Sequence, residues 1–151
     1  KEKMLFLIQF RTFNSLLNNL NEKLVGVDDP IEQIRVMIRT HIEYFAANMA
    51  ALKVCSHELD SLTGDAYVET REIRIAYYQL VRSIVDRLLD ERAPDAGIDH
   101  HVATMSLFGT LNWLYRWYDP KNDGSPTALS NQIAEQFLSG IITTTPTTTD
   151  G

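Results

Sequence analysis

Four histidines are the side chains of this 151-residue chain best suited to bind a metal ion or to move a proton. His41 lies one helical turn from Ile38 and from Phe45, at the border of an apolar face, where it could contact a ligand or a metal. The alternative is a histidine at the flank of a helix that is hydrogen-bonded to a neighbour. Joint ligation by His41, His57 and His101 has suitable ligand chemistry, but their separation in sequence leaves their proximity open.

The motifs that would indicate an enzyme are missing from the sequence. The seven glycines are scattered, so they form no phosphate-binding loop, and no Gly-x-Ser-x-Gly elbow occurs. His57-Glu58 lacks the second histidine of a zinc-protease helix, and none of the nine glutamates has a histidine three residues later, as a di-iron bundle requires. We therefore expect no enzyme activity, no cofactor and no metal site.

A second group of side chains is of the kind that lines a cavity for an apolar small molecule. Methionine and aromatic side chains recur at helical spacing, and the alternative interpretation is that they form ordinary core. Asn112 stands inside an apolar run, where an unpartnered buried amide would cost about 1 to 3 kcal/mol, so it needs a partner from the backbone, another subunit or a ligand. The predicted ligand-binding residues are His41, Phe45, Met49, Tyr78, Met105, Phe108 and Asn112.

Net charge and cysteine content exclude further functions. Fourteen Lys and Arg against twenty Asp and Glu give a formal net charge of −6, so this chain has no basic surface with which to hold DNA by itself. The single cysteine, Cys55, excludes an internal disulfide and a cysteine-based zinc cage, and we expect it to be inert. An intracellular, cytoplasmic location is favoured.

No apolar run approaches the roughly 18 residues of a membrane span, and no signal-peptide layout is present, so we expect no membrane partner. The chain opens at Lys1 without an initiator methionine, and its first residues already have a helical pattern. We expect it to be a fragment or a processed product whose upstream part is absent.

Glycine and proline divide the sequence into helical stretches. Apolar residues recur at spacings of three and four, and the expected helices cover residues 1–24, 30–51, 52–59, 66–92, 98–118 and 126–142. Neither strand alternation nor an internal repeat is evident. The sequence therefore predicts an all-α helical bundle, with one domain over residues 1–142 and a disordered threonine-rich tail over 143–151.

The stretch from Ile98 to Tyr118 is apolar on most of its sides. Eleven of the seventeen residues from 102 to 118 are apolar or aromatic. On a helix, Trp113 and Trp117 lie on a different face from the leucines, and Gly109 lies on a third. Such a helix must be covered on more than one side, and a small subunit has few elements to do so. We therefore expect a second chain to cover it.

This segment resembles part of a known family. The C-terminal half of TetR-type transcriptional regulators is similar to residues 105–120, MSLFGTLNWLYRWYDP, to the Gly-Ser-Pro loop that follows, and to the helix ending in QFLSG over 136–140. The run HELDSL over 57–62 resembles the loop before the seventh helix of these regulators. The first residues, KEKML, resemble the start of the fourth helix, which directly follows the helix-turn-helix domain.

The resemblance, over about residues 1–142, implies an effector-binding and dimerisation domain of a transcription regulator that lacks its N-terminal helix-turn-helix. It implies a homodimer formed by a four-helix bundle, with DNA bound only through the absent domain. In the regulators most similar over the aromatic segment, the effectors are acyl-CoA thioesters, whose phosphates Arg71, Arg74 or Arg116 could meet. The implied interface residues are Gly109, Trp113, Trp117, Leu129, Ile133, Phe137 and Ile141.

Two other classes of protein stay open from the sequence. The first is a helical interaction module whose exposed apolar helix binds another polypeptide. The second is a metal-dependent helical enzyme, which would contain a stoichiometric metal ion.

Overall fold

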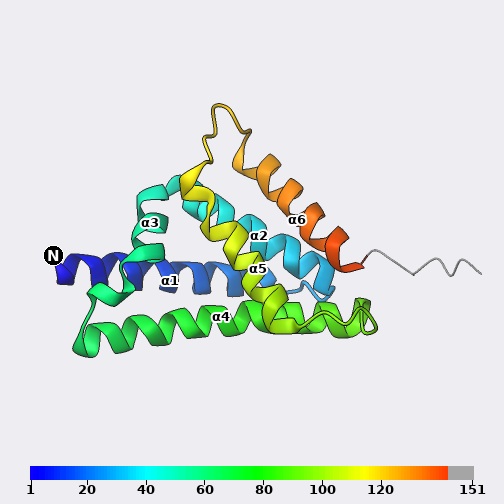
Figure 1. Cartoon of the computed structure of the whole chain (residues 1–151), viewed down its shortest axis with the longest axis horizontal. Coiled ribbons are helices and arrows are strands. Elements are labelled where there is room, and N and C mark those ends of the chain that lie inside the picture. Colours follow the sequence, from blue (N-terminus) through cyan, green and yellow to red (C-terminus); the bar gives the residue numbers. More distant parts are fainter. Residues whose placement is uncertain (143–151) are drawn as a thin grey trace, which may run out of the picture.

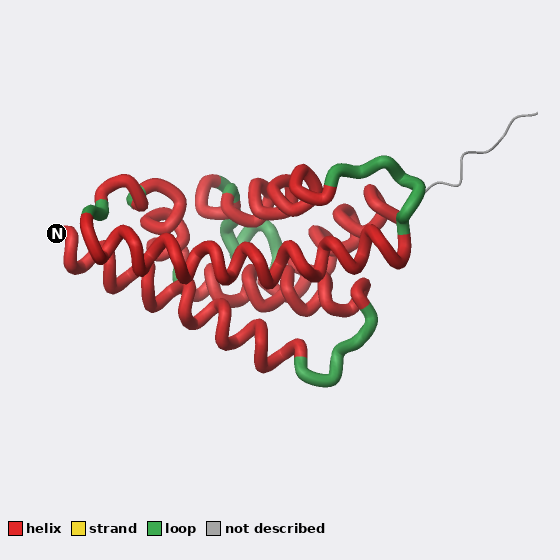
Figure 2. Tube along the Cα trace, turned by 90° about the horizontal axis from the view of Figure 1, so that it is seen from below, coloured by secondary structure: helices red, strands yellow, loops and turns green. Residues whose placement is uncertain are grey.

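The computed structural model describes residues 1–142, so the predicted tail over 143–151 lies outside the described residues. This part of the chain contains helices and no strand, and the predicted all-α fold is confirmed (Figure 2). The six α-helices and two short 3-10 helices are α1 (Glu2–Leu24), α2 (Pro30–Ala47), α3 (Met49–His57), η1 (Leu59–Ser61), α4 (Gly64–Arg92), α5 (His100–Asn112), η2 (Leu114–Arg116) and α6 (Pro126–Ile142).

Local sequence fixes where the main helices begin. Asp29 precedes α2, and its carboxylate accepts a hydrogen bond from the amide of Ile31, while Pro30 occupies the first turn, where its missing N–H costs nothing. Asp99 caps α5 in the same way by accepting a 2.8 Å hydrogen bond from the amide of Val102.

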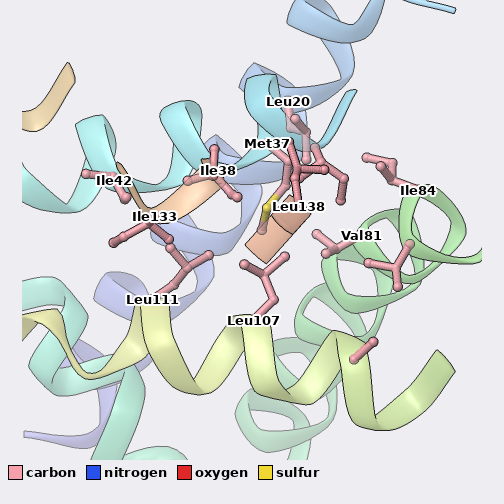
Figure 3. Close-up of a cluster of buried hydrophobic side chains, with 14 of the residues drawn as sticks. Leu20, Met37, Ile38, Ile42, Val81, Ile84, Leu107, Leu111, Ile133 and Leu138 are labelled. Atoms are coloured by element: carbon pink, nitrogen blue, oxygen red, sulfur yellow. The ribbon is translucent and has the colours of Figure 1, made fainter. Parts of the chain in front are cut away.

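The helices pack around one core. Helices α1 and α4 lie side by side, α2 packs along α6, and α5 crosses between α4 and α2 (Figure 1). Buried aliphatic side chains from α1, α2, α4, α5 and α6 meet between these helices (Figure 3); they include Leu20, Met37, Ile38, Val81, Leu107, Leu111 and Leu138. Fully burying one such side chain contributes roughly 1.5 to 3 kcal/mol, so this cluster holds the bundle together.

Two helix boundaries differ from the prediction. Helix α2 ends at Ala47, because Asn48 leaves the helical conformation (φ −135°), and α3 restarts at once with a different direction. The predicted single helix over 98–118 instead ends at Asn112 and tightens into η2. This tighter turn directs both Leu114 and Tyr118 into the core, and the Tyr118 hydroxyl donates to the carbonyl of Gly124 at 2.9 Å.

Within residues 1–142, no helix combines the length and the apolar character that crossing a membrane would require.

Candidate ligand-binding cavity

A cavity of about 300 Å³ lies among the first five α-helices. Ligand pockets for small molecules typically begin at about this volume. Six of the seven predicted ligand-binding residues line its wall: His41, Phe45, Tyr78, Met105, Phe108 and Asn112. Arg71, Met105 and Asn112 are exposed, so the cavity opens to solvent at their side. The interior is mostly apolar, and its rim is polar.

Met49 is the predicted residue that does not line the cavity. Its assignment assumed that one helix runs past Phe45 to residue 51, which would place Met49 one turn farther along the same face. The break at Asn48 ends that register. Met49 instead packs, half-buried, against the outside of the core, so its assignment to the cavity wall is wrong.

The deepest polar pair in the cavity wall is His41 and Tyr77. Both side chains are buried, and the Nδ1 atom of His41 lies 2.8 Å from the Tyr77 hydroxyl oxygen. Rings of Phe45 and Phe108 lie 4.8 and 6.3 Å from the imidazole centroid. Burial among these rings lowers the pKa of His41 to about 3 and raises the pKa of Tyr77, so both groups are neutral near pH 7.

Arg74 supplies a positive charge in the cavity wall. Its Nη1 donates a 2.7 Å hydrogen bond to the carbonyl oxygen of Cys55, and its guanidinium lies 4.8 Å from the ring centroid of Phe13 on α1. Partial burial lowers the pKa of Arg74 from its usual value. Because the nearby Cys55 thiol is buried, its pKa is raised to about 11, as expected of an unreactive thiol.

Gln9 on α1 is hydrogen-bonded to residues next to the cavity wall. Its side chain is fully buried, and its amide donates a 3.1 Å hydrogen bond to the carbonyl oxygen of Glu58, at the C-terminal end of α3. The Gln9 amide oxygen also accepts a long hydrogen bond from Arg74. Helices α1, α3 and α4 are therefore joined by polar contacts directly behind the cavity wall.

The histidines do not converge on one site. His41, His57 and His101 bond to three different tyrosine hydroxyls, those of Tyr77, Tyr115 and Tyr78. Within the described helices and loops, no group of three His, Cys, Asp or Glu side chains is placed to hold a metal ion. The hypothesis of joint ligation by the three histidines is wrong, because each ring is held on its own by hydrogen bonding.

An exposed surface that runs along α5 and past η2 carries large apolar side chains. Trp113 and Trp117 are 57% and 48% exposed, and Val102 is also exposed. Gly109 is exposed one helical turn before Trp113, so the prediction that it lies on a separate face is wrong, and a Cβ atom there would meet nothing within 4 Å in the same chain. No charged residue occurs between His101 and Arg116. We name this surface, made by Val102, Gly109, Trp113 and Trp117, the α5 face.

Three residues predicted at a subunit interface are already covered by their own chain. Leu129, Ile133 and Ile141 are buried on the side of α6 that packs on α2, and Phe137 is half-buried beside them. Little of these three side chains is therefore left for a second subunit to cover, and their part in a subunit contact stays a prediction. The outer side of α6 is instead polar, with Gln132, Glu135 and Gln136 exposed.

Several lining residues were not among the predicted ligand contacts. They are Phe13, Leu52, Cys55, Ser56, Ile75 and Tyr77, together with Arg71 and Arg74. The sequence suggests these two arginines only as possible contacts to phosphate. Arg116, the third such arginine, stacks over the Trp113 ring at 5.5 Å and is not part of the cavity wall. Phe13 and Leu52 carry no signal in the sequence beyond helical periodicity, which core residues share.

An all-α bundle with an apolar cavity and a polar rim is the architecture of a ligand-binding domain. The model of a known family, described as "Tetracyclin repressor-like, C-terminal domain", matches residues 27–141. The chain therefore belongs to this family and is the ligand-binding domain of a TetR-family transcription regulator, which confirms the resemblance found in the sequence. A comparison with curated proteins gave no match.

Solved structures have the same fold. PfmR, a TetR-family regulator from Thermus thermophilus, is 22% identical with a TM-score of 0.78, over 91% of this chain and 74% of that one. A TetR-family regulator from Bordetella parapertussis is 27% identical with a TM-score of 0.76, over 91% and 71%. AibR, solved with isovaleryl coenzyme A and operator DNA, is 18% identical with a TM-score of 0.74, over 93% and 74%.

Proposed function

We propose that this domain senses an acyl-CoA thioester, whose acyl chain enters the cavity and whose phosphates meet the arginines at its rim. The observation that carries the proposal is a mostly apolar cavity with two cationic side chains, Arg71 and Arg74, in its wall. Arginine is well suited to phosphate because its planar guanidinium offers paired donors. The complex of AibR with isovaleryl coenzyme A shows that a protein of this fold binds this class of molecule.

The cavity volume limits what is enclosed. At about 300 Å³ it holds a volume similar to ten water molecules, which suits an acyl chain and its thioester. The nucleotide part of coenzyme A would then stay outside, near the exposed Arg71.

The signal would pass through α1. This helix contributes Phe13 to the cavity wall and is tied by Gln9 to the end of α3. In a complete regulator of this family, the DNA-binding domain would precede α1, so a movement of α1 would change the spacing of two DNA-binding domains in a dimer. A ligand shifts such an equilibrium only by binding the two arrangements with different affinity.

Homodimerisation is the second part of the proposal. The exposed tryptophans and the open space over Gly109 favour a second copy on the α5 face, because large apolar surfaces on soluble domains mark interaction sites. A helical module that binds a different polypeptide through the same face is the alternative, and it predicts a monomer in the purified chain.

Isothermal titration of the full chain with free CoA and with acetyl-, isovaleryl-, hexanoyl- and decanoyl-CoA tests the effector. We expect one saturable site per chain and an affinity that grows about fourfold for each CH₂ buried, until the cavity is filled. Met105→Trp narrows the cavity entrance and should weaken binding at least tenfold. Met4→Trp places the same bulk on an exposed side chain outside the cavity wall and should not. Uniformly flat heats would remove the proposal.

A further inference from the structure

One polar atom in the cavity wall lacks a hydrogen-bond partner. Nε2 of His41 is buried and makes no hydrogen bond within residues 1–142. Nδ1 of the same ring is hydrogen-bonded to the Tyr77 hydroxyl. A buried polar group without a partner is unfavourable, because it has lost its hydrogen bonds to water and gained none in return. Since His41 lines the cavity, a ligand that enters it is the natural partner for this atom.

The Tyr77 hydroxyl determines which hydrogen-bonding role Nε2 has. In one arrangement the hydroxyl donates to Nδ1, which places the single imidazole proton on Nε2. In the other, Nδ1–H donates to the hydroxyl oxygen, which leaves two groups unpaired: the Tyr77 hydroxyl hydrogen and the Nε2 lone pair. The hydroxyl of Tyr77 makes no second bond in the described chain, so the first arrangement leaves fewer groups unsatisfied. It makes Nε2–H a donor.

The surroundings of this donor limit the acceptor that it can serve. The rings of Phe45, Tyr77 and Phe108 pack around the imidazole and carry no charge, and the Arg74 guanidinium in the same cavity wall is hydrogen-bonded to Cys55 and Gln9 rather than to His41. A carboxylate would be desolvated there at high cost. A neutral carbonyl oxygen is acceptor-only and brings no unpaired donor of its own.

We propose that the Nε2–H of His41 donates a hydrogen bond to a neutral carbonyl oxygen of the effector, so that the cavity selects acyl compounds over alkyl compounds of the same length. His41 is then a specificity-determining residue, and Tyr77 is a positioning residue that holds the required tautomer. This inference rests on the proposed function, because it assumes that the effector enters this cavity.

The test compares hexanoyl-CoA with S-hexyl-CoA, in which a CH₂ group replaces the thioester carbonyl. By titration calorimetry on the full chain, we expect hexanoyl-CoA to bind about tenfold tighter. In the double variant His41→Phe/Tyr77→Phe, both partners become apolar rings of similar shape, so no buried group is stranded. The preference, taken as the ratio of the two affinities in the same protein, should fall below about twofold.

A second measurement does not depend on any ligand. Imidazole ¹⁵N shifts of histidine-labelled wild-type protein report the tautomer, and the double variant assigns the His41 signals. We expect a protonated Nε2 and an unprotonated Nδ1 in the free protein.

The outcomes separate the two proposals. Equal affinity of wild type for both compounds overturns the role of His41 but leaves an acyl-CoA effector standing. A protonated Nδ1, or a preference that survives in the double variant, also overturns the role of His41. No binding of either compound overturns the proposed effector, and this inference with it.

Discussion

The guanidinium of Arg74 on α4 donates a 2.7 Å hydrogen bond to the carbonyl oxygen of Cys55 near the end of α3, while it forms part of the cavity wall. One side chain thus both closes the end of a helix and presents a positive charge to the cavity. A bound phosphate or thioester near Arg74 would compete with this hydrogen bond. Binding at the cavity and the packing of α3 are therefore linked through one residue.

Replacing Arg74 with methionine separates these roles from a simple loss of charge. Arg74→Met keeps the apolar part of the side chain but removes the donor, so we expect the free energy of unfolding in urea to fall by about 2 kcal/mol and affinity for hexanoyl-CoA to fall at least tenfold. Arg71→Met is the matched control, because Arg71 is exposed on the same rim. It should weaken binding while stability stays within about 0.5 kcal/mol. Equal stability of the two variants would contradict the structural role of Arg74.

Burial of His41 makes stability depend on pH. Its pKa is about 3 in the folded chain against 6.5 for an ordinary histidine, so between these values the unfolded chain binds a proton that the folded chain does not. Stability therefore rises with pH across this window and is lost as the pH falls below 6.5. From pH 6.5 to pH 5, we expect wild type to lose about 2 kcal/mol more unfolding free energy than His41→Phe/Tyr77→Phe. Urea unfolding at both pH values measures this, and parallel losses in the two proteins would refute it.

The α5 face gives a prediction for the oligomeric state. Trp113→Glu places a charge in the middle of the proposed subunit contact, and we expect light scattering to report half the mass of wild type with helix content unchanged. Met4→Glu is the control, because Met4 is 64% exposed on α1, outside the α5 face. It should keep the dimer mass. If Trp113→Glu has the same mass as wild type, this face is not the interface.

A substitution at Gly109 tests whether the two α5 helices approach closely in the proposed dimer. Within one chain a Cβ at this position meets nothing within 4 Å, so alanine should stabilise the helix by up to about 1 kcal/mol. If a second α5 approaches closely, the same methyl group would weaken the dimer. We expect Gly109→Ala to raise the dimer dissociation constant about tenfold on dilution, yet to stabilise the monomeric Trp113→Glu variant. A dimer that is tightened by alanine would exclude close approach.

Helical periodicity is enough to predict the all-α fold and six of the residues in the cavity wall. A spacing of three and four residues identifies which side chains share a face, and His41, Phe45 and Tyr78 do lie together around the cavity. Periodicity does not identify what covers that face. The apolar side of α6, which the family resemblance assigns to a second subunit, is covered by α2 of the same chain.

Helix breaks account for the other differences. Extending α2 through Asn48 places Met49 on the face of Phe45, but the backbone of Asn48 leaves the helical conformation. Contacts such as Arg74 with Cys55 or His41 with Tyr77 join positions 19 and 36 residues apart. The crossing of separate helices determines such contacts, and no local pattern encodes them.

Methionine methyl NMR tests most directly whether an acyl-CoA occupies the cavity. The chain contains four methionines, of which Met105 lines the cavity and Met4 is exposed on α1. On titration of the wild-type chain with hexanoyl-CoA, we predict a saturable shift that is largest for the Met105 methyl group, with the Met4 methyl group unmoved. A Met105 signal that stays in place while hexanoyl-CoA is raised to millimolar concentration would contradict the account.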